Sequence, residues 1–155
     1  MARPNERHLQ NPGLRGGGRS SPRAAGALPT PNHIEYFVDG DGGRPNPALI
    51  AGSEELAKQI SGMPPSQLRR FYGEVASIAR QDEMSAEAIL THMALMKAKV
   101  AYTLGRRTKE DDFPDAFVQF VFDHAASVQN WTGFQEFRRI FEAVVAFHRF
   151  YGKNE

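Results

Sequence analysis

Residues 115–123 read Asp-Ala-Phe-Val-Gln-Phe-Val-Phe-Asp, and this stretch decides the expected fold. On a helix, its large apolar side chains point in nearly all directions instead of along one stripe. These side chains are Phe117, Val118, Phe120, Val121 and Phe122. A helix that is apolar all round lies at the centre of a bundle or in an interface. We therefore expect a helix from the turn at Pro114 to about Val128 that other elements, or a partner, cover on every side.

Four further segments show the helical period, in which apolar residues recur every three or four positions. We expect these helices at about 53–60, 66–81, 85–104 and 132–152. Ser53 is the expected N-cap of the first, Gly105 ends the third, and Thr132 with Gln135 forms a capping box at the start of the last. No strand pattern of any length follows residue 50. The expected fold is all-α, a compact bundle of about five helices.

The first 52 residues lack this period. Residues 1–33 are rich in Arg, Gly and Pro and hold almost no large apolar side chain, so they cannot bury enough surface to offset the entropy of ordering. We expect a disordered tail there, an extended arm and turn over residues 34–52, and one helical domain over residues 53–155. The tail segment Arg15–Arg19 is similar to the Arg/Gly stretches that bind RNA loosely, although low-complexity sequence explains it equally well.

The net charge of +1 conceals an asymmetry along the chain. Residues 1–34 carry five arginines and one glutamate, a net of +4, whereas the remaining residues carry a net of −3. The folded part is therefore not a basic domain that coats DNA, and any contact with nucleic acid must come from a local basic face, from the tail, or from both. No apolar run approaches the roughly 18 residues that span a bilayer, and no hydrophobic signal is visible at the N-terminus, so we expect a cytoplasmic protein without membrane contact.

Signatures of catalysis and of metal binding are missing from the sequence. There is no cysteine, and no two histidines have the spacing of a metal site. The sequence at Asp39–Gly43 is similar to the start of a calcium loop, but Ile50 stands at the twelfth position, where such a loop needs glutamate. No GxSxG elbow occurs, and Gly16–Gly18 lacks the remainder of a phosphate-binding loop. We predict a non-catalytic protein without cofactor or metal.

The basic residues at the third expected helix lie on different faces of it. Lys99 and Arg106 point the same way, opposite the apolar stripe, with Tyr102 beside them. Lys97 falls within the apolar stripe, so its ammonium group must reach an edge or find a partner. Tyr102 can stack on a ligand or pack against the protein, and we expect packing.

The second and fifth expected helices also carry basic residues. Arg69 shares an outward face with Gly73, whose lack of a side chain leaves room for a nucleic-acid backbone. Arg138 and Arg149 lie on one edge of the last helix, and His148 lies on its apolar side, where a satisfied core histidine is expected. All these cations can equally be a solvated face or, as Arg138 and Glu142 suggest by their spacing, partners in ion pairs along a helix.

Three stretches, in this order, together resemble one family. They are Ser-Gln-Leu-Arg-Arg-Phe-Tyr at 66–72, Met-Lys-Ala-Lys-Val-Ala-Tyr at 96–102 followed by Gly105-Arg106, and Phe-Glu-Ala-Val-Val-Ala-Phe-His-Arg-Phe-Tyr-Gly at 141–152. They are similar to the small subunit of the type III-A CRISPR interference complex, the Csm complex, over residues 47–152. Ala98 stands where this family often has proline, and the Arg/Gly/Pro tail is not part of the family pattern.

The resemblance implies a non-catalytic bundle whose copies stack head to tail along a larger subunit. It implies that these copies, with other Csm subunits, line the groove that holds guide RNA and target RNA, and that they touch mainly the target RNA without sequence preference. A filament needs uncovered apolar surface, which residues 117–122 offer in excess of one core face. Repetition would supply the avidity that an acidic domain lacks alone.

Carried residue by residue, the resemblance implies an RNA-binding set that converges on one groove. The first choices are Arg69, Lys97, Lys99, Arg106 and Arg149, and the second choices are Arg70, Arg107 and Arg138. Two other classes of protein were weighed. A helical adaptor that binds only protein stays open, with its basic residues merely solvated. A helix-turn-helix DNA binder is disfavoured, because DNA would repel the acidic turn at Asp82-Glu83.

Overall fold

The computed structural model describes residues 27–40 and 42–152, which hold five α-helices and confirm the all-α bundle. The helices are α1 Pro47–Gln59, α2 Pro65–Ala79, α3 Ala86–Arg106, α4 Asp115–Ser127 and α5 Trp131–Tyr151. The described residues contain no strand, only isolated bridges beside the turn at Gly40. Residues 1–26, most of the expected disordered tail, lie outside the described part.

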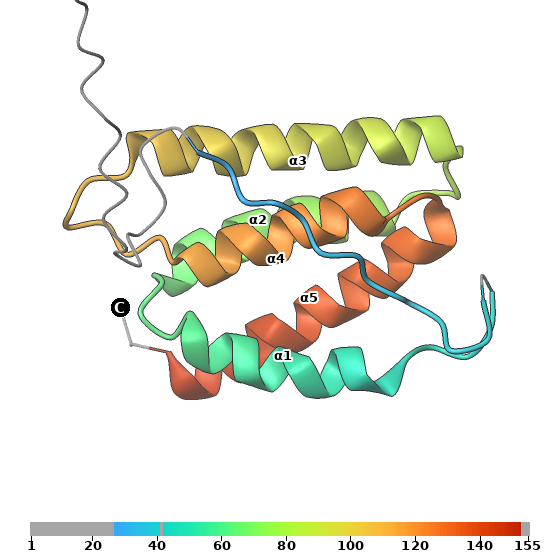
Figure 1. Cartoon of the computed structure of the whole chain (residues 1–155), viewed down its shortest axis with the longest axis horizontal. Helices are drawn as coiled ribbons and strands as arrows, with labels where there is room; N and C mark the ends of the chain where they lie inside the picture. The colour runs from blue at the N-terminus through green and yellow to red at the C-terminus, as the bar shows by residue number, and fades with distance from the viewer. Residues whose placement is uncertain (1–26, 41, 153–155) are drawn as a thin grey trace, which may run out of the picture.

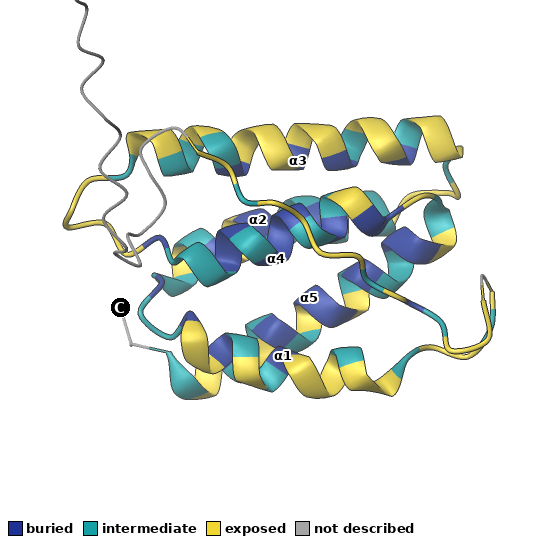
Figure 2. Cartoon of the chain, in the orientation of Figure 1, coloured by how far each residue is buried: buried dark blue, intermediate teal, exposed yellow. Residues whose placement is uncertain are grey.

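The helices pack in three layers (Figure 1). α3 forms one outer layer and packs on α4, α2 packs on α5, and α1 packs against α5 on the opposite side of the molecule from α3. Because α3 contacts the bundle by one side only, its other side is exposed along its whole length (Figure 2). α3 is therefore the helix with most surface to offer a partner.

α4 is the central helix, as its sequence predicts. All five of its large apolar side chains from Phe117 to Phe122 are buried within this chain. The Phe117 ring centroid lies 5.4 Å from that of Phe71 on α2 and 6.1 Å from that of Phe141 on α5. The excess apolar surface that we assigned to a filament contact is thus covered by the chain itself, and that argument for self-association was wrong.

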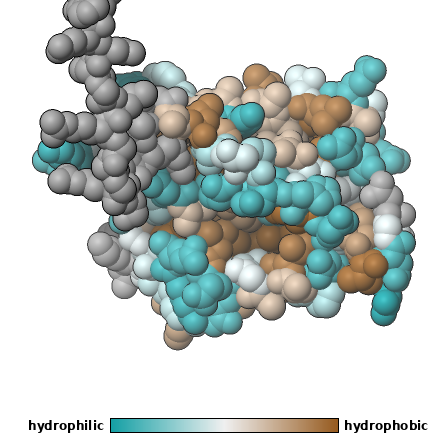
Figure 3. Space-filling model, viewed as in Figure 1, coloured by the Kyte–Doolittle hydropathy of each residue, from teal (hydrophilic) through white to brown (hydrophobic). Residues whose placement is uncertain are grey.

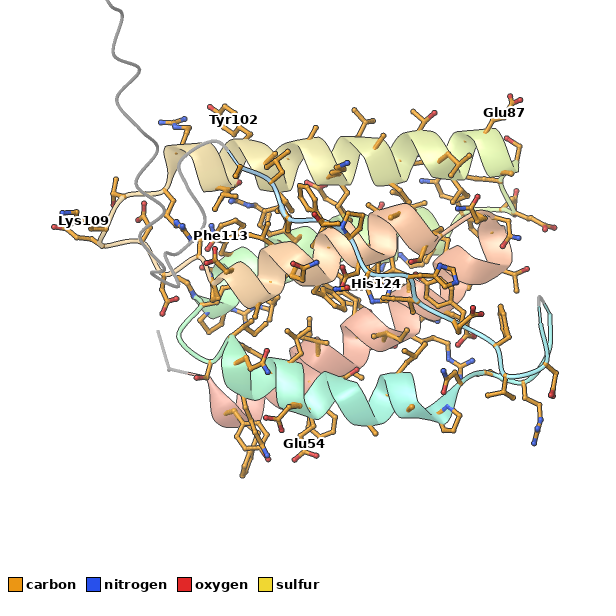
Figure 4. The ribbon with its side chains drawn as sticks, in the orientation of Figure 1. Glu54, Glu87, Tyr102, Lys109, Phe113 and His124 are labelled. Atoms are coloured by element: carbon orange, nitrogen blue, oxygen red, sulfur yellow. The ribbon has the colours of Figure 1, made fainter. Side chains whose placement is uncertain are left out.

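Part of this cover comes from the segment that precedes α1. Residues 30–38 run along α4 as an extended arm (Figure 1), and they hold Tyr36, which is only 7% exposed. The Tyr36 hydroxyl shares a 2.7 Å hydrogen bond with Nδ1 of the buried His124. Figure 4 labels His124 on α4. Burial lowers the pKa of His124 to about 3 and, together with the charge of Asp123, raises the pKa of Tyr36. Both groups of this pair are therefore neutral at physiological pH.

Two predicted helix starts were wrong. α1 begins at Pro47, where the Asn46 side chain caps the Ala48 amide at 3.1 Å. Ser53, the expected cap, lies inside the helix and donates to the carbonyls of Leu49 at 3.1 Å and Ile140 at 3.3 Å. Asn followed by Pro is itself a helix-start signal, because proline has no amide hydrogen to satisfy.

The start of α5 and the end of α3 also differ from the prediction. α5 begins after Asn130, whose Oδ1 accepts from the Gly133 amide at 2.9 Å, so Thr132 does not form the expected capping box. α3 continues through Gly105 and ends at Arg106. α2 and α4 begin and end within two residues of the predicted positions.

Candidate nucleic-acid interface

α3 is the cationic element of the described structure. Between Glu87 and Glu110 the sequence holds no Asp or Glu, and over the same stretch α3 carries the three cations Lys97, Lys99 and Arg106. Glu87 lies at the start of α3 and Tyr102 near its end, where the ring points away from the bundle (Figure 4). The ring of Tyr102 is 64% exposed, so our expectation that it packs was wrong. The exposed side of α3 thus joins positive charge to an aromatic ring, a combination that suits nucleic acid.

A groove lies between the start of α2, the end of α3 and the loop that leads to α4. Its volume is about 730 Å³, and its charged lining is Arg70, Arg106, Arg107, Asp111 and Asp112. Uncharged hydrogen-bonding side chains stand among them, namely Ser66, Gln67, Tyr102 and Thr103. We call this cavity the α2–α3 groove. It brings together three of the eight basic residues of the predicted set.

Arg106 and Tyr102 form one edge of the α2–α3 groove. Arg106 Nη1 donates to the Tyr102 hydroxyl at 2.8 Å, and the guanidinium carbon lies 5.5 Å from the ring centroid. Both residues are exposed, and the described residues offer Arg106 no carboxylate partner. The guanidinium group is thus positioned by a neutral neighbour and keeps donors for a phosphate.

The acidic residues of the α2–α3 groove are held by local structure. Hydrogen bonds from the Thr108 amide at 2.9 Å and hydroxyl at 3.1 Å lower the pKa of Asp111. A Cβ atom on Gly62 would overlap the carboxylate of Asp112, so this loop lies directly against the α1–α2 turn. These two negative charges reduce the attraction of the groove for phosphate, which therefore depends on Arg70 and Arg106.

Arg107 fixes the loop to the bundle. Its Nη1 donates to the Phe113 carbonyl at 2.8 Å and lies 3.3 Å from Asp115 Oδ1. Phe113, labelled in Figure 4, is buried, and its ring lies beside those of Phe71 and Phe117. Arg107 therefore shapes the α2–α3 groove more than it adds free charge to it.

Lys97 and Lys99 lie on opposite flanks of α3, because side chains two positions apart on a helix point about 200° away from each other. Lys97 is exposed, and its Nζ lies 5.2 Å from the centroid of Phe122 on α4, so the expectation that it reaches an edge or finds a partner is confirmed. Lys99 Nζ donates to Glu74 Oε2 on α2 at 2.7 Å. Lys99 thus belongs to the α2 side, about one turn from the groove residue Thr103, and Lys97 does not.

The other predicted residues lie outside the α2–α3 groove. Arg69 is exposed on α2, and Arg149 is exposed near the end of α5 beside Phe150, which is 81% exposed. Arg138 donates to Glu142 at 2.7 Å, in the ion pair that its spacing suggested. The single convergent groove that we expected therefore takes Arg70, Arg106 and Arg107. Lys99 lies about one helical turn from it, and Lys97, Arg69, Arg138 and Arg149 lie on separate surfaces.

A second, smaller cavity of about 320 Å³ lies between α1, α4 and α5. Its lining is mostly apolar, with Leu49, Leu56 and Val144 among its residues, and Figure 3 shows it as a brown hollow below the polar band of the arm. Its titratable residues are Asp123 and the buried, neutral His124. Such a lining does not suit a phosphate backbone.

Within the described ranges, no three His, Cys, Asp or Glu side chains are grouped as metal ligands would be. In that same part of the chain, no helix has the length and apolar composition needed to cross a membrane.

Comparison with known proteins gives one result. Residues 45–154 match the model of a protein family described as Csm2 Type III-A. This stretch contains all five helices and the α2–α3 groove, and it leaves out residues 1–44. No curated protein and no solved structure matches the chain.

Proposed function

Because the chain belongs to the Csm2 Type III-A family, the small subunits of the type III-A CRISPR interference complex, we propose that it grips the sugar-phosphate backbone of RNA and catalyses no reaction. The strand it touches is mainly target RNA, in the groove that other Csm subunits form around the guide–target duplex. Copies of the subunit stack head to tail, so that each adds a few contacts. We expect this assembly in the cytoplasm.

The observation that carries the proposal is the meeting of Arg70 and Arg106 across one groove with an exposed Tyr102 at its edge. Arginine binds phosphate oxygens through paired N–H donors, and this contact is blind to base sequence. An aromatic ring stacks on any base, which is also tolerant of sequence. The α2–α3 groove therefore has the chemistry for RNA held without sequence preference.

Lys99 extends this surface along α3. Its partner Glu74 is itself half-buried to exposed, and an ion pair in that environment contributes only about 0–1 kcal/mol. A phosphate can thus replace Glu74 as the partner of Lys99 at little cost. Lys97, Arg69, Arg138 and Arg149 lie elsewhere, and their contact with RNA requires strands or copies beyond the α2–α3 groove.

The test is RNA binding by the double variant Arg70→Ala/Arg106→Ala, measured by fluorescence anisotropy on several single-stranded RNA sequences at increasing salt. We expect weaker binding to every RNA sequence. The slope of the logarithm of the binding constant against the logarithm of salt concentration should fall in magnitude by about 1.4, since each phosphate contact on a single strand contributes about 0.7. Arg138→Ala is the control, because Glu142 already holds that guanidinium.

An unchanged affinity and slope in the double variant, with complex assembly intact, would reject the groove as an RNA site. That result would favour a helical adaptor that binds only protein, for which the exposed Leu95 and Phe150 offer apolar contact surface.

A further inference from the structure

The outer side of α3 carries large apolar side chains that the described residues leave open to solvent. Leu90, Leu95 and Tyr102 are 42%, 53% and 64% exposed, so three of the seven exposed large apolar side chains among the described residues lie on this one helix. Glu87 and Tyr102, near the two ends of α3, both point away from the bundle (Figure 4). Apolar surface of this kind, rimmed by polar residues, is typical of a contact with another protein chain.

The two ends of this outer side carry opposite charges. Glu87 lies in the first turn of α3, and Arg106 is its last residue, about 28 Å further along the helix axis. Both side chains are exposed, and neither has an ion-pair partner among the described residues. A second α3 laid alongside in the antiparallel direction brings each of these charges to its opposite. A parallel copy would instead set like charges against each other, which is unfavourable.

The antiparallel register that joins these charges also matches the side chains between them by size. The pairs that it sets opposite each other are Glu87 with Arg106, Thr91 with Tyr102, and Leu95 with Ala98. The large side chains of Tyr102 and Leu95 thus each meet a smaller one. All six residues are exposed, and they point within an arc of about 100° around α3. Lys97 lies outside this arc and stays over Phe122 of its own chain.

We propose that two copies of the free chain pair through the outer sides of their α3 helices, antiparallel and related by a two-fold axis, and that RNA separates them. In such a pair every contact occurs twice, once from each copy. Arg106 and Tyr102 form an edge of the α2–α3 groove, so the second copy covers the guanidinium group and the ring that RNA uses. The competition rests on RNA binding by the groove, whereas the pairing does not.

The pairing is reversible, because its parts are weak. Ion pairs between exposed residues add little stability, and a single pair of helices about 30 Å long buries less surface than the interface of a permanent dimer. A strand of RNA offers Arg106 a phosphate in place of Glu87 and offers Tyr102 a base in place of Thr91. The free chain therefore keeps this edge of the groove covered until RNA displaces the second copy.

Charge reversal in the full chain tests the pairing, with sedimentation equilibrium at protein concentrations of about 5 to 500 μM, which cover the dissociation constants of weak dimers. We expect a monomer–dimer equilibrium in the wild type. Glu87→Arg sets two cations against each other and should raise the dissociation constant at least about tenfold, and Arg106→Glu should do the same with two anions. The double variant Glu87→Arg/Arg106→Glu restores opposite charges and should return the constant to within about threefold of the wild type.

Glu55→Arg is the matched control, because Glu55 is exposed on α1, on the opposite side of the molecule from α3. This variant should leave the dissociation constant unchanged. The pairing would be overturned by a chain that stays monomeric at every concentration, by single reversals that leave the dimer intact, or by a dimer that the double reversal fails to restore.

The competition is tested by adding to the paired chain a single-stranded RNA of about eight nucleotides, a length that one small domain can cover. We expect the dimer to separate into monomers that each carry one RNA. A dimer that persists with RNA bound would overturn the competition. A dimer that persists and binds no RNA would reject the proposed function and the competition with it, while the charge reversals decide the pairing independently.

Discussion

The pair formed by Tyr36 and His124 shows how one residue couples the arm to the bundle. His124 is 2% exposed and shares its Nδ1 hydrogen bond with a phenol that comes from 88 positions away. The Phe120 and Phe137 rings lie against the imidazole, with centroids 4.6 Å and 4.8 Å away. A charged imidazolium would lose its solvation here without gaining a carboxylate in return.

This burial predicts a dependence of stability on pH. The pKa of His124 is about 3 in the folded chain, whereas an unfolded histidine titrates near 6.5. Between these values the unfolded chain binds a proton that the folded chain does not, so the free energy of unfolding falls as pH drops, by at most about 1.4 kcal/mol per unit. Urea unfolding of the wild type and of His124→Gln from pH 7 to pH 4 measures this. Equal slopes in both proteins would contradict it.

At the scale of the helices, side-chain caps decide where each element begins. Asn46, Ser85 and Asn130 each accept a hydrogen bond from an amide in the first turn of their helix. Asn46, Ser85 and Asn130 are residue types that favour the N-cap position, but Ser53 and Thr132 favour it as well. Ser53 is instead used inside α1, where its hydroxyl joins two carbonyls and bridges to α5. Cap propensity alone cannot separate such cases, because the choice depends on packing.

The two candidate caps of α5 give a matched test. Asn130→Ala removes the acceptor for the Gly133 amide and is expected to lower the free energy of unfolding by about 1 kcal/mol, within the range of about 0.5–2 for such caps. Thr132→Ala, at an exposed position without a side-chain cap, should change it by less than about 0.5 kcal/mol. Chemical denaturation measures both. A larger loss in the threonine variant would restore the capping box.

The candidate site was only partly predictable, because it depends on which side each helix turns toward its neighbours. Periodicity correctly placed Arg106, Lys99 and Tyr102 on the exposed side of α3. It could not show that Arg70 lines the same groove as Arg106 and Tyr102, since α2 packs on α5 whereas α3 packs on α4. Helix spacing did predict the Arg138–Glu142 pair within α5, but it could not show that Glu74 on α2 holds Lys99 on α3. These are long-range facts, and they depend on both partners.

At the scale of the whole molecule, phenylalanine rings connect α2, α4 and α5. Phe117 contacts the rings of Phe71, Phe113, Phe120 and Phe141, which belong to α2, the α3–α4 loop, α4 and α5. The apolar pattern of residues 115–123 predicted this central position. Its excess of large side chains is used within one chain, because the surrounding helices and the arm bury Phe117, Val118, Phe120, Val121 and Phe122.

The core predicts a large effect for one substitution. Phe117→Ala removes a fully buried ring at the meeting point of three helices, so we expect the free energy of unfolding to fall by about 3–5 kcal/mol. Tyr102→Ala removes an exposed ring and should cost less than about 0.5 kcal/mol. Thermal and urea unfolding measure both variants. A similar, small loss in the two would show that the ring cluster does not stabilise the bundle.

The contacts of the arm have a consequence for how such chains are recognised. Gln119, Asp123 and Ser127 are spaced by four on a helix, which advances about 6 Å per step, and their partners Thr30, Asn32 and Ile34 are spaced by two on extended chain, which advances about 6.7 Å. Because these two spacings are nearly equal, the arm and α4 stay in register over all three hydrogen-bonded pairs. A single residue inserted beside Asn32 would shift this register, so that the Thr30 carbonyl and the Asn32 and Ile34 amides could no longer all meet their partners on α4. Polar residues spaced by four on the central helix, together with an extended segment upstream, are therefore the sequence pattern by which a similar arm could be recognised in other chains.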